Sequence, residues 1–184
     1  ILWWSTDPRM VLQPAHFRLH RSLRQAIRKA VATPGFALRI DSDFAAVIRT
    51  CSQISRDGQD GTWIVDDIQA AYSQLHGDGF AHSVEVWMDG DLVAGLYCVA
   101  IGRAVFGESM FTTITNGSKI ALAALVTHLD RYASRGNRRR NLFVEHPSPQ
   151  TAANDQQMQR LAAATQLGIR QGDHFGTNRV ANHG

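Results

Sequence analysis

The chain has little cysteine, and its two cysteines lack the neighbouring ligand residues that metal sites need. Cys51 and Cys98 are the two cysteines among 184 residues, and no metal-type Cys/His spacing surrounds them. Both fall on apolar faces, one of a predicted helix and one of a predicted strand. We therefore expect packed thiols rather than ligands or nucleophiles, and no bound metal.

Long apolar runs and phosphate-binding loops are also missing. No run reaches the ~18 residues expected of a membrane span, and no signal-peptide pattern opens the chain. Lys119 lacks the glycine frame of a nucleotide-binding P-loop. We expect a cytoplasmic protein that has no membrane partner and requires no cofactor.

Positive charge is scarce in the first two thirds of the chain. Residues 1–132 contain 12 Lys and Arg against 13 Asp and Glu, a net charge of −1, whereas residues 133–184 contain 7 Arg against 3 acids, a net charge of +4. The high pI of the whole chain therefore does not by itself indicate that residues 1–132 bind nucleic acid.

One segment of residues 1–132 is nevertheless basic. Apolar residues recur at helical spacing between Leu19 and Ala30, which predicts an amphipathic helix. Its other side carries four residues that are candidates for binding phosphates: Arg21, Arg24, Arg28 and Lys29. Such a face is either solvated surface or a surface that contacts phosphates, and the sequence leaves both open.

The remaining pattern predicts helices around a meander of strands. Asp43 is expected to cap a second helix, and Asp66 or Asp67 a third, with Ile68, Ala71, Tyr72 and Leu75 facing inward. Strands are expected at 37–40, 83–87, 92–101 and 104–110, with a tight turn at Asp89-Gly90 and a last helix opened by Asn116 or Ser118. This order indicates an α/β (α+β) domain with a mixed or antiparallel sheet flanked by helices.

A single carboxylate stands in apolar company in the run from Phe106 to Phe111. Glu108 lies between Gly107 and Ser109 there. Burying an unpaired carboxylate is costly, so such a residue either turns to solvent and backbone N–H groups or meets a partner such as a substrate amine. Both interpretations remain open on composition alone.

Several tryptophan-rich motifs occur in a fixed order along the chain. They are Ile1-Leu2-Trp3-Trp4-Ser5, Asp7-Pro8-Arg9, Gly61-Thr62-Trp63-Ile64, Ala71-Tyr72, Leu75-His76, Ala81-His82-Ser83-Val84-Glu85-Val86-Trp87 and Gly107-Glu108-Ser109-Met110-Phe111. Over residues 1 to about 132 the chain thereby resembles the bacterial leucyl/phenylalanyl-tRNA:protein transferases.

The resemblance implies an activity, its partners and a fold. It implies transfer of Leu or Phe, or Met, from aminoacyl-tRNA to acceptor proteins that begin with Arg or Lys, which marks them for degradation. It also implies an acyl-CoA N-acyltransferase-like fold for residues 1–132, with a small upstream domain missing. Residues 133–184 lack the family's Asp-x-Gln and His-Leu-x-Ser-Leu-Gly motifs. We expect them to form a divergent or frameshifted, poorly ordered tail, and the chain by itself to be inactive.

The same resemblance implies roles for individual residues. Glu108 would be catalytic, holding the acceptor or polarising its amine. Trp63 would line the substrate cleft, where it could stack on the terminal adenine of tRNA. The pocket for the Leu or Phe side chain maps onto Leu96, Val105, Leu122, Leu125 and Leu129. Periodicity alone makes these five core residues, and a pocket is a core with one side missing.

Two other functions remain as alternatives. An acetyl-CoA-dependent N-acetyltransferase would use the same fold, but it needs a Gly-rich pyrophosphate loop that is absent between Phe106 and Lys119. An inactive RNA-binding remnant would use the basic helix together with Arg138 to Arg140. RNA binding without transfer of an amino acid would favour the second alternative.

Overall fold

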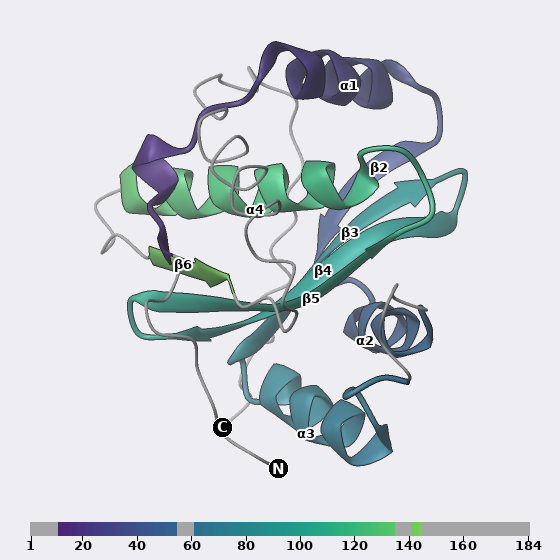
Figure 1. The fold of residues 1–184 in the computed structure, drawn as a ribbon, viewed down its shortest axis with the longest axis vertical. Coiled ribbons are helices and arrows are strands. Elements are labelled where there is room, and N and C mark those ends of the chain that lie inside the picture. Colours follow the sequence, from purple (N-terminus) through teal and green to yellow (C-terminus); the bar gives the residue numbers. More distant parts are fainter. Residues whose placement is uncertain (1–10, 55–60, 135–140, 145–184) are drawn as a thin grey trace, which may run out of the picture.

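The computed structural model describes residues 11–54, 61–134 and 141–144, and these form one six-stranded sheet with helices on both faces (Figure 1). The strands are β1 (Val11–Leu12), β2 (Phe36–Ile40), β3 (Ala81–Met88), β4 (Asp91–Ile101), β5 (Ala104–Thr112) and β6 (Asn141–Val144). The helices are α1 (Arg21–Ala32), α2 (Phe44–Gln53), α3 (Asp66–Gly77) and α4 (Gly117–Ser134), with a 3-10 turn at Pro14–His16.

The sheet is mixed. Its strand order is β1-β6-β5-β4-β3-β2, in which β5 and β6 run parallel and every other neighbouring pair is antiparallel. The α4 helix makes the crossover that a parallel pair requires. The predicted α/β architecture with a mixed sheet flanked by helices is confirmed.

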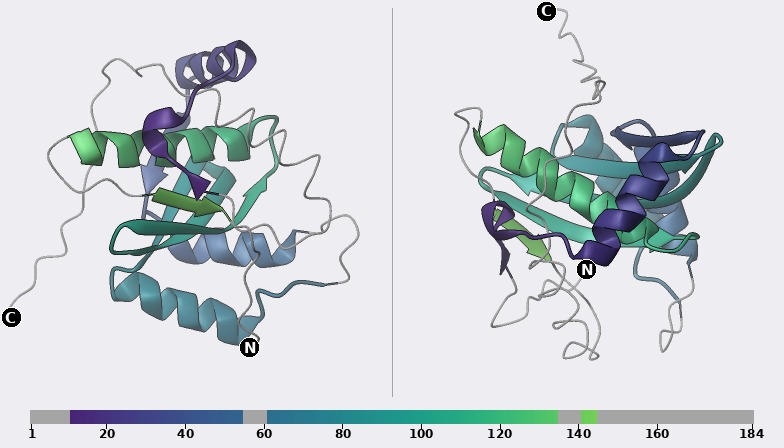
Figure 2. Two further views of the ribbon diagram at one scale, coloured as in Figure 1. Left: turned by 60° about the vertical axis from the view of Figure 1, so that its left-hand side comes forward. Right: turned by 90° about the horizontal axis from the view of Figure 1, so that it is seen from above.

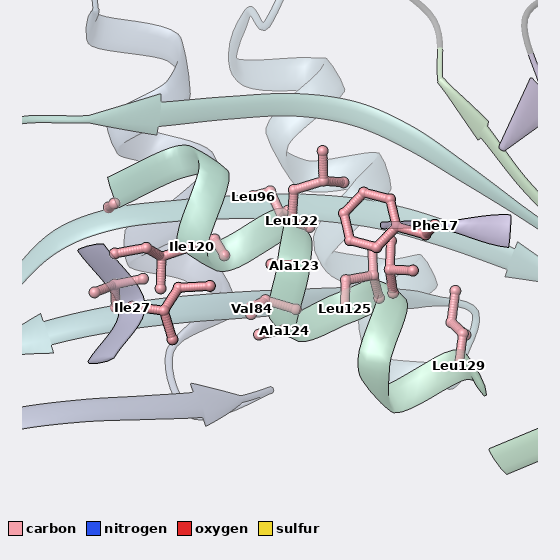
Figure 3. Packing of buried hydrophobic residues seen from close by; sticks show 14 of the residues in the cluster. Phe17, Ile27, Val84, Leu96, Ile120, Leu122, Ala123, Ala124, Leu125 and Leu129 are labelled. Carbon is pink, nitrogen blue, oxygen red and sulfur yellow. The ribbon is translucent and has the colours of Figure 1, made fainter. Parts of the chain in front are cut away.

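The two faces of the sheet bury separate cores. Helices α1 and α4 cover one face and α2 and α3 cover the other, as the two views of Figure 2 also show. The larger cluster lies under α4, where Val84 and Leu96 of the sheet meet Leu122 and Leu125 of the helix (Figure 3). The smaller cluster packs α2 and α3 onto Tyr97, Val99 and Phe111.

A β-bulge in β5 changes which residues of that strand face which core. Tyr97 is opposite Ser109 and the next residue, Cys98, is opposite Gly107, so Glu108 is an extra residue on β5. Val105 and Phe111 are an even number of residues apart and would share a face in a regular strand. They instead belong to different clusters, because the bulge reverses the alternation between them.

The helix boundaries bear out one predicted cap and correct others. Asp43 caps α2, since its Oδ1 accepts a hydrogen bond of 2.9 Å from the Ala46 amide. The prediction that Asp66 or Asp67 caps α3 is wrong: Val65 is the N-cap residue, in extended conformation, and no side chain caps it. Both acids lie in the first turn, where their negative charges interact favourably with the positive end of the helix dipole.

One further position differs from the sequence prediction, and the predicted start of the last helix at Asn116 is confirmed. Ala71 was expected to face inward but is exposed, whereas Tyr72 of the same helix is half-buried. The α4 helix begins at Gly117, so Ser118 lies inside it, while the Asn116 carbonyl accepts its first bond from the Ile120 amide. Asn116 has φ 66°, a left-handed conformation that asparagine tolerates well.

Part of the segment expected to be a poorly ordered tail forms a strand. Asn141–Val144 make up β6, which lies between β5 and β1 in the sheet. Its four residues include Leu142, Phe143 and Val144, a short apolar run of the kind that favours a strand buried in a sheet. The other residues of the tail beyond Ser134 lie outside the described residues, as do the motifs at Trp3 and Trp4.

Candidate active site

Glu108 is placed by the bulge of β5. The strand pairs with β6 from Ala104 to Gly107, and this pairing ends directly before Glu108. On its other side, β5 pairs with β4, and the bulge in that pairing is at Glu108. Bulges re-aim a side chain and are frequent next to active sites. The Glu108 side chain is directed to the face of the sheet that α2 and α3 cover, where it is half-buried.

Tyr72 of α3 holds the carboxylate. Its hydroxyl donates a hydrogen bond of 2.9 Å to Oε2 of Glu108. Burial raises the pKa of Tyr72 far above its ordinary value, and the negative charge of Glu108 and the hydrogen bond to it raise that pKa further. The phenol therefore stays protonated at physiological pH and serves as a fixed donor to the acid.

Trp63 lies beside this pair and is open to solvent. Its ring meets that of Tyr72 edge-on at 6.3 Å between centroids, and the residue is 37% exposed. Val65, two residues later, is also exposed. A large aromatic face next to an anchored carboxylate can contact an aromatic or apolar group of a ligand.

The five residues mapped to the amino-acid pocket come together on the opposite face of the sheet. Leu96, Val105, Leu122, Leu125 and Leu129 are all buried in the cluster under α4, and Figure 3 labels four of them around that helix. Val105 precedes the bulge and Glu108 is the extra residue of the bulge, so the two sets meet at β5. In this structure the five side chains form core packing, and their role as a pocket stays a prediction.

The basic face of α1 is largely accessible. Arg21, Arg28 and Lys29 are exposed. Arg24 is half-buried and its Nη2 donates to the Leu19 carbonyl at 3.3 Å, so part of its hydrogen-bonding capacity serves the fold. The α1 helix covers the α4 side of the sheet, away from Glu108 and Tyr72 (Figure 1).

Sequence reasoning placed Tyr72 on an inward helix face but gave it no part in the site. A half-buried tyrosine needs a partner for its hydroxyl, and Glu108 was already singled out as a carboxylate in apolar company. A tyrosine hydroxyl that needs an acceptor and a carboxylate that needs a donor are a signal that the sequence contains. Which of the buried or half-buried groups meet depends on the packing of α3 against β5.

A second carboxylate, Glu85, is fully buried on the same side of the sheet. It accepts hydrogen bonds from the backbone amides of Ser42 and Asp43 and from the Ser83 hydroxyl, the last at 2.6 Å. These donors belong to the start of α2 and to β3 itself. Glu85 therefore ties α2 to the sheet and is not open to a ligand.

The described residues carry a candidate carboxylate site on a mixed α/β sheet. None of the helices in this part of the chain is long and apolar enough to cross a membrane. No three His, Cys, Asp or Glu side chains among the described residues are grouped to hold a metal ion. The described part of the chain is thus a mixed α/β protein in which the acid Glu108 lies beside the aromatic residues Tyr72 and Trp63.

The chain belongs to the leucyl/phenylalanyl-tRNA protein transferase family, whose model matches residues 11–135. It is 64% identical over 126 residues to a leucyl/phenylalanyl-tRNA–protein transferase of Leptothrix cholodnii, covering 68% of this chain and 49% of that protein. A relative of the same name from Albidiferax ferrireducens is 59% identical over 125 residues, covering 68% of this chain and 49% of that protein. The chain spans about half the length of the curated relatives it matches.

Solved structures with a similar arrangement are distant in sequence. An aminoglycoside N-acetyltransferase in complex with CoA has a TM-score of 0.45 at 14% identity, covering 78% of this chain and 93% of that one. The L-PGS structure from Bacillus licheniformis has a TM-score of 0.48 at 12% identity, covering 74% of this chain and 45% of that one.

Proposed function

We propose that this chain carries the catalytic carboxylate, a general base, of an aminoacyltransferase, which moves Leu or Phe from aminoacyl-tRNA to the α-amino group of an acceptor protein. The observation that supports it is the Glu108 carboxylate, re-aimed by a bulge and held by the Tyr72 hydroxyl at 2.9 Å. Family membership supplies the reaction class. The acceptor is a protein that begins with Arg or Lys and is marked for degradation in the cytoplasm.

The transfer reaction requires few catalytic groups from the protein beyond one correctly positioned acid or base. The ester that joins the amino acid to tRNA is already activated, so an attacking amine needs to lose a proton and to be held close to the carbonyl. Glu108 takes the proton as the new amide bond forms. The ester bond to the ribose oxygen then breaks and this oxygen takes the proton back from Glu108, so tRNA leaves with its hydroxyl restored and the carboxylate is charged again.

Tyr72 keeps Glu108 ready for that role. A hydrogen bond donated to a carboxylate stabilises its charged form, and only the charged form accepts a proton. Because the pKa of Tyr72 is raised by burial and by Glu108, the phenol does not itself give up its proton in the working range. In this proposal Trp63, which is 37% exposed and meets Tyr72, stacks on the terminal base of tRNA.

Replacing Glu108 by Gln tests the proposal directly. The test uses an exchange protein: the Leptothrix cholodnii relative in which the 126 matching residues are replaced by the corresponding residues of this chain. Transfer of radiolabelled Leu from Leu-tRNA to a protein with N-terminal Arg is then measured. We expect Glu108→Gln to lower kcat by about tenfold to a thousandfold, the scale of one lost acid/base or electrostatic contribution.

A matched control removes one exposed carboxylate elsewhere. Asp67→Asn at the start of α3 changes the net charge by the same amount and lies away from the bond between Glu108 and Tyr72. It should leave transfer unchanged. Equal kinetics for Glu108→Gln and the unsubstituted exchange protein would remove Glu108 from the reaction.

A further inference from the structure

A row of aromatic rings connects α2 and α3 beneath the sheet and ends at Glu108. Tyr97 of β4 meets Phe44 of α2 edge-on at 5.9 Å and Tyr72 of α3 edge-on at 5.2 Å between centroids. Tyr72 in turn meets Trp63 at 6.3 Å and donates its hydroxyl to Glu108. The ring of Tyr97 is therefore the link between the sheet and the residue that holds the acid.

Tyr97 is also the residue of β4 at which the bulge begins. It is opposite Ser109, while Cys98 is opposite Gly107, so the extra residue Glu108 leaves β5 directly across from the Tyr97–Cys98 step. Tyr97 thus contacts the ring of Tyr72 and also lies opposite the backbone of β5 that carries the Glu108 carboxylate. Tyr97 therefore adjoins both the donor and the acceptor of one hydrogen bond.

Tyr72 is held by the core against which its helix packs. The α3 helix has no fully buried residue, and its half-buried Ile68, Tyr72 and Leu75 pack against the cluster that contains Tyr97. Of the two rings that touch Tyr72, Trp63 is 37% exposed whereas Tyr97 is fully buried at 0%. A hydroxyl keeps a hydrogen bond only when its ring is held at the right distance and angle, and the buried ring is the one that can do this.

We propose that Tyr97 is a positioning residue, whose ring fixes the ring of Tyr72 so that the Tyr72 hydroxyl stays on Glu108. It acts through its ring, since its edge-on contacts with Phe44 and Tyr72 are ring contacts. Its effect on transfer rests on the function proposed above. Its effect on the Tyr72–Glu108 pair does not.

The first experiment uses the 184-residue chain and needs no activity. Tyrosine ring carbons are labelled with ¹³C, the Tyr72 signal is assigned with Tyr72→Phe, and its ionisation is followed to about pH 11, above the ordinary tyrosine pKa of about 10. In the unsubstituted chain Tyr72 should remain protonated there. In Tyr97→Leu its titration midpoint should fall toward the ordinary value, because the ring moves off Glu108 and into water.

Two variants separate positioning from general destabilisation. Tyr97→Phe keeps the ring and should leave the Tyr72 titration as it is in the unsubstituted chain. Val47→Ala removes a fully buried side chain from the same cluster but leaves every ring of the aromatic row in place, and should also leave the titration unchanged despite a lower Tm. If Tyr97→Leu does not fold, Tyr97→Met takes its place, because the longer and more flexible methionine side chain adapts better to an irregular space.

The outcomes decide the two proposals separately. A Tyr72 titration in Tyr97→Leu that matches that of Val47→Ala would overturn the positioning role, whatever the fate of the transferase proposal. In the exchange protein, Tyr97→Leu should lower kcat by about tenfold or more with KM for the acceptor little changed, as expected for a misplaced catalytic group. An unsubstituted exchange protein without transfer would overturn the proposed function and leave the titration result to decide the role of Tyr97.

Discussion

Two of the carboxylates on the α2 and α3 side of the sheet, Glu85 and Glu108, differ in how far they are buried and in how many donors surround them. Glu85 is 0% exposed and is surrounded by donors from its own strand and from the start of α2. Glu108 is half-buried and is held by a tyrosine from a helix with no buried residue. The donors around Glu85 stabilise the fold, whereas the partial exposure of Glu108 is compatible with the catalytic role proposed above.

Asp41 is a third carboxylate, and its surroundings make stability depend on pH. Burial acts to raise the pKa of Asp41, but the hydrogen bonds from His82 at 2.8 Å and from the Ser83 amide at 2.8 Å, with the nearby His82 and His76, outweigh it and lower that pKa. A lowered pKa means that the folded state favours the charged form. The stabilisation is therefore complete above the ordinary Asp value of about 3.9 and is lost as the pH falls through the folded value.

Asp41→Asn should reduce the sensitivity of the fold to acid. The unsubstituted chain is expected to lose more free energy of unfolding between about pH 6 and pH 3 than the variant, because the variant has no charge to neutralise. Urea unfolding followed by circular dichroism at several pH values measures this. Asp67→Asn serves as the control for loss of one exposed charge. Parallel acid profiles for the unsubstituted chain and Asp41→Asn would show that the Asp41 interactions contribute nothing to stability.

At the scale of elements, α4 begins where the sheet leaves no room for a side chain. A Cβ on Gly117 would overlap Oγ1 of Thr112 and lie 2.7 Å from Cβ of Ala94. Gly77, at the last position of α3, has nothing within 4 Å of the corresponding point. The first glycine therefore permits close packing of α4 on β4, and the second does not serve packing.

These two glycines give a matched pair of substitutions. Gly to Ala in a helix usually stabilises by up to about 1 kcal/mol, because glycine loses more backbone entropy on folding. Gly77→Ala should be neutral or stabilising. Gly117→Ala should instead destabilise by about 1–3 kcal/mol, the usual cost of overpacking, since a Cβ on residue 117 would crowd Ala94. Thermal unfolding of both variants checks the difference in sign, and equal Tm shifts would contradict it.

The exposed cations of α1 give the second prediction at this scale. Reversing Arg21, Arg28 and Lys29 to Glu should weaken tRNA binding and reduce the slope of log K against log salt by about 0.7–0.9 for each phosphate that the helix no longer neutralises. Arg24 is left in place because it bonds the Leu19 carbonyl. Filter binding at several salt concentrations measures the slope, and Arg49→Glu on α2 is the control for charge reversal at an exposed site. An unchanged slope would mean that the α1 face is solvated surface.

At the scale of the whole molecule, the sheet is completed by a strand from beyond α4. β6 pairs with β5 in parallel and with β1 in antiparallel orientation, so it joins the start of the described chain to the middle of the sheet. Without it, β1 has no neighbour in the described sheet order and β5 presents an open edge. Open edges of this kind favour association between chains.

Two truncations test what β6 contributes. A chain ending at Val144 keeps the strand, and a chain ending at Ser134 removes it. The shorter chain should have a lower free energy of unfolding and a greater tendency to associate, because backbone groups of β1 and β5 lose their partners. Urea unfolding and size-exclusion chromatography compare the two. If both chains are equally stable and monomeric, β6 is dispensable.

The sequence determined the local elements of this protein and its family. Periodicity, the Asp43 cap and the Asp89-Gly90 turn suffice to predict most helices and strands, because these signals act between residues a few positions apart. The order of the tryptophan-rich motifs suffices for the family. Local patterns also made Glu108 a candidate, since a carboxylate in an apolar run is unusual wherever it folds.

Only the tertiary structure decided which side chains meet and which face each residue serves. The bulge at Glu108 reverses the alternation of β5, so Val105 and Phe111 pack in different cores, and no count of residues along the strand reveals that. The bond from Tyr72 to Glu108 joins residues 36 positions apart on different elements. The sheet's sixth strand likewise depends on residues beyond α4 finding β5 and β1. Contacts of this range follow from how whole helices and strands pack, and a linear pattern records only which groups need a partner.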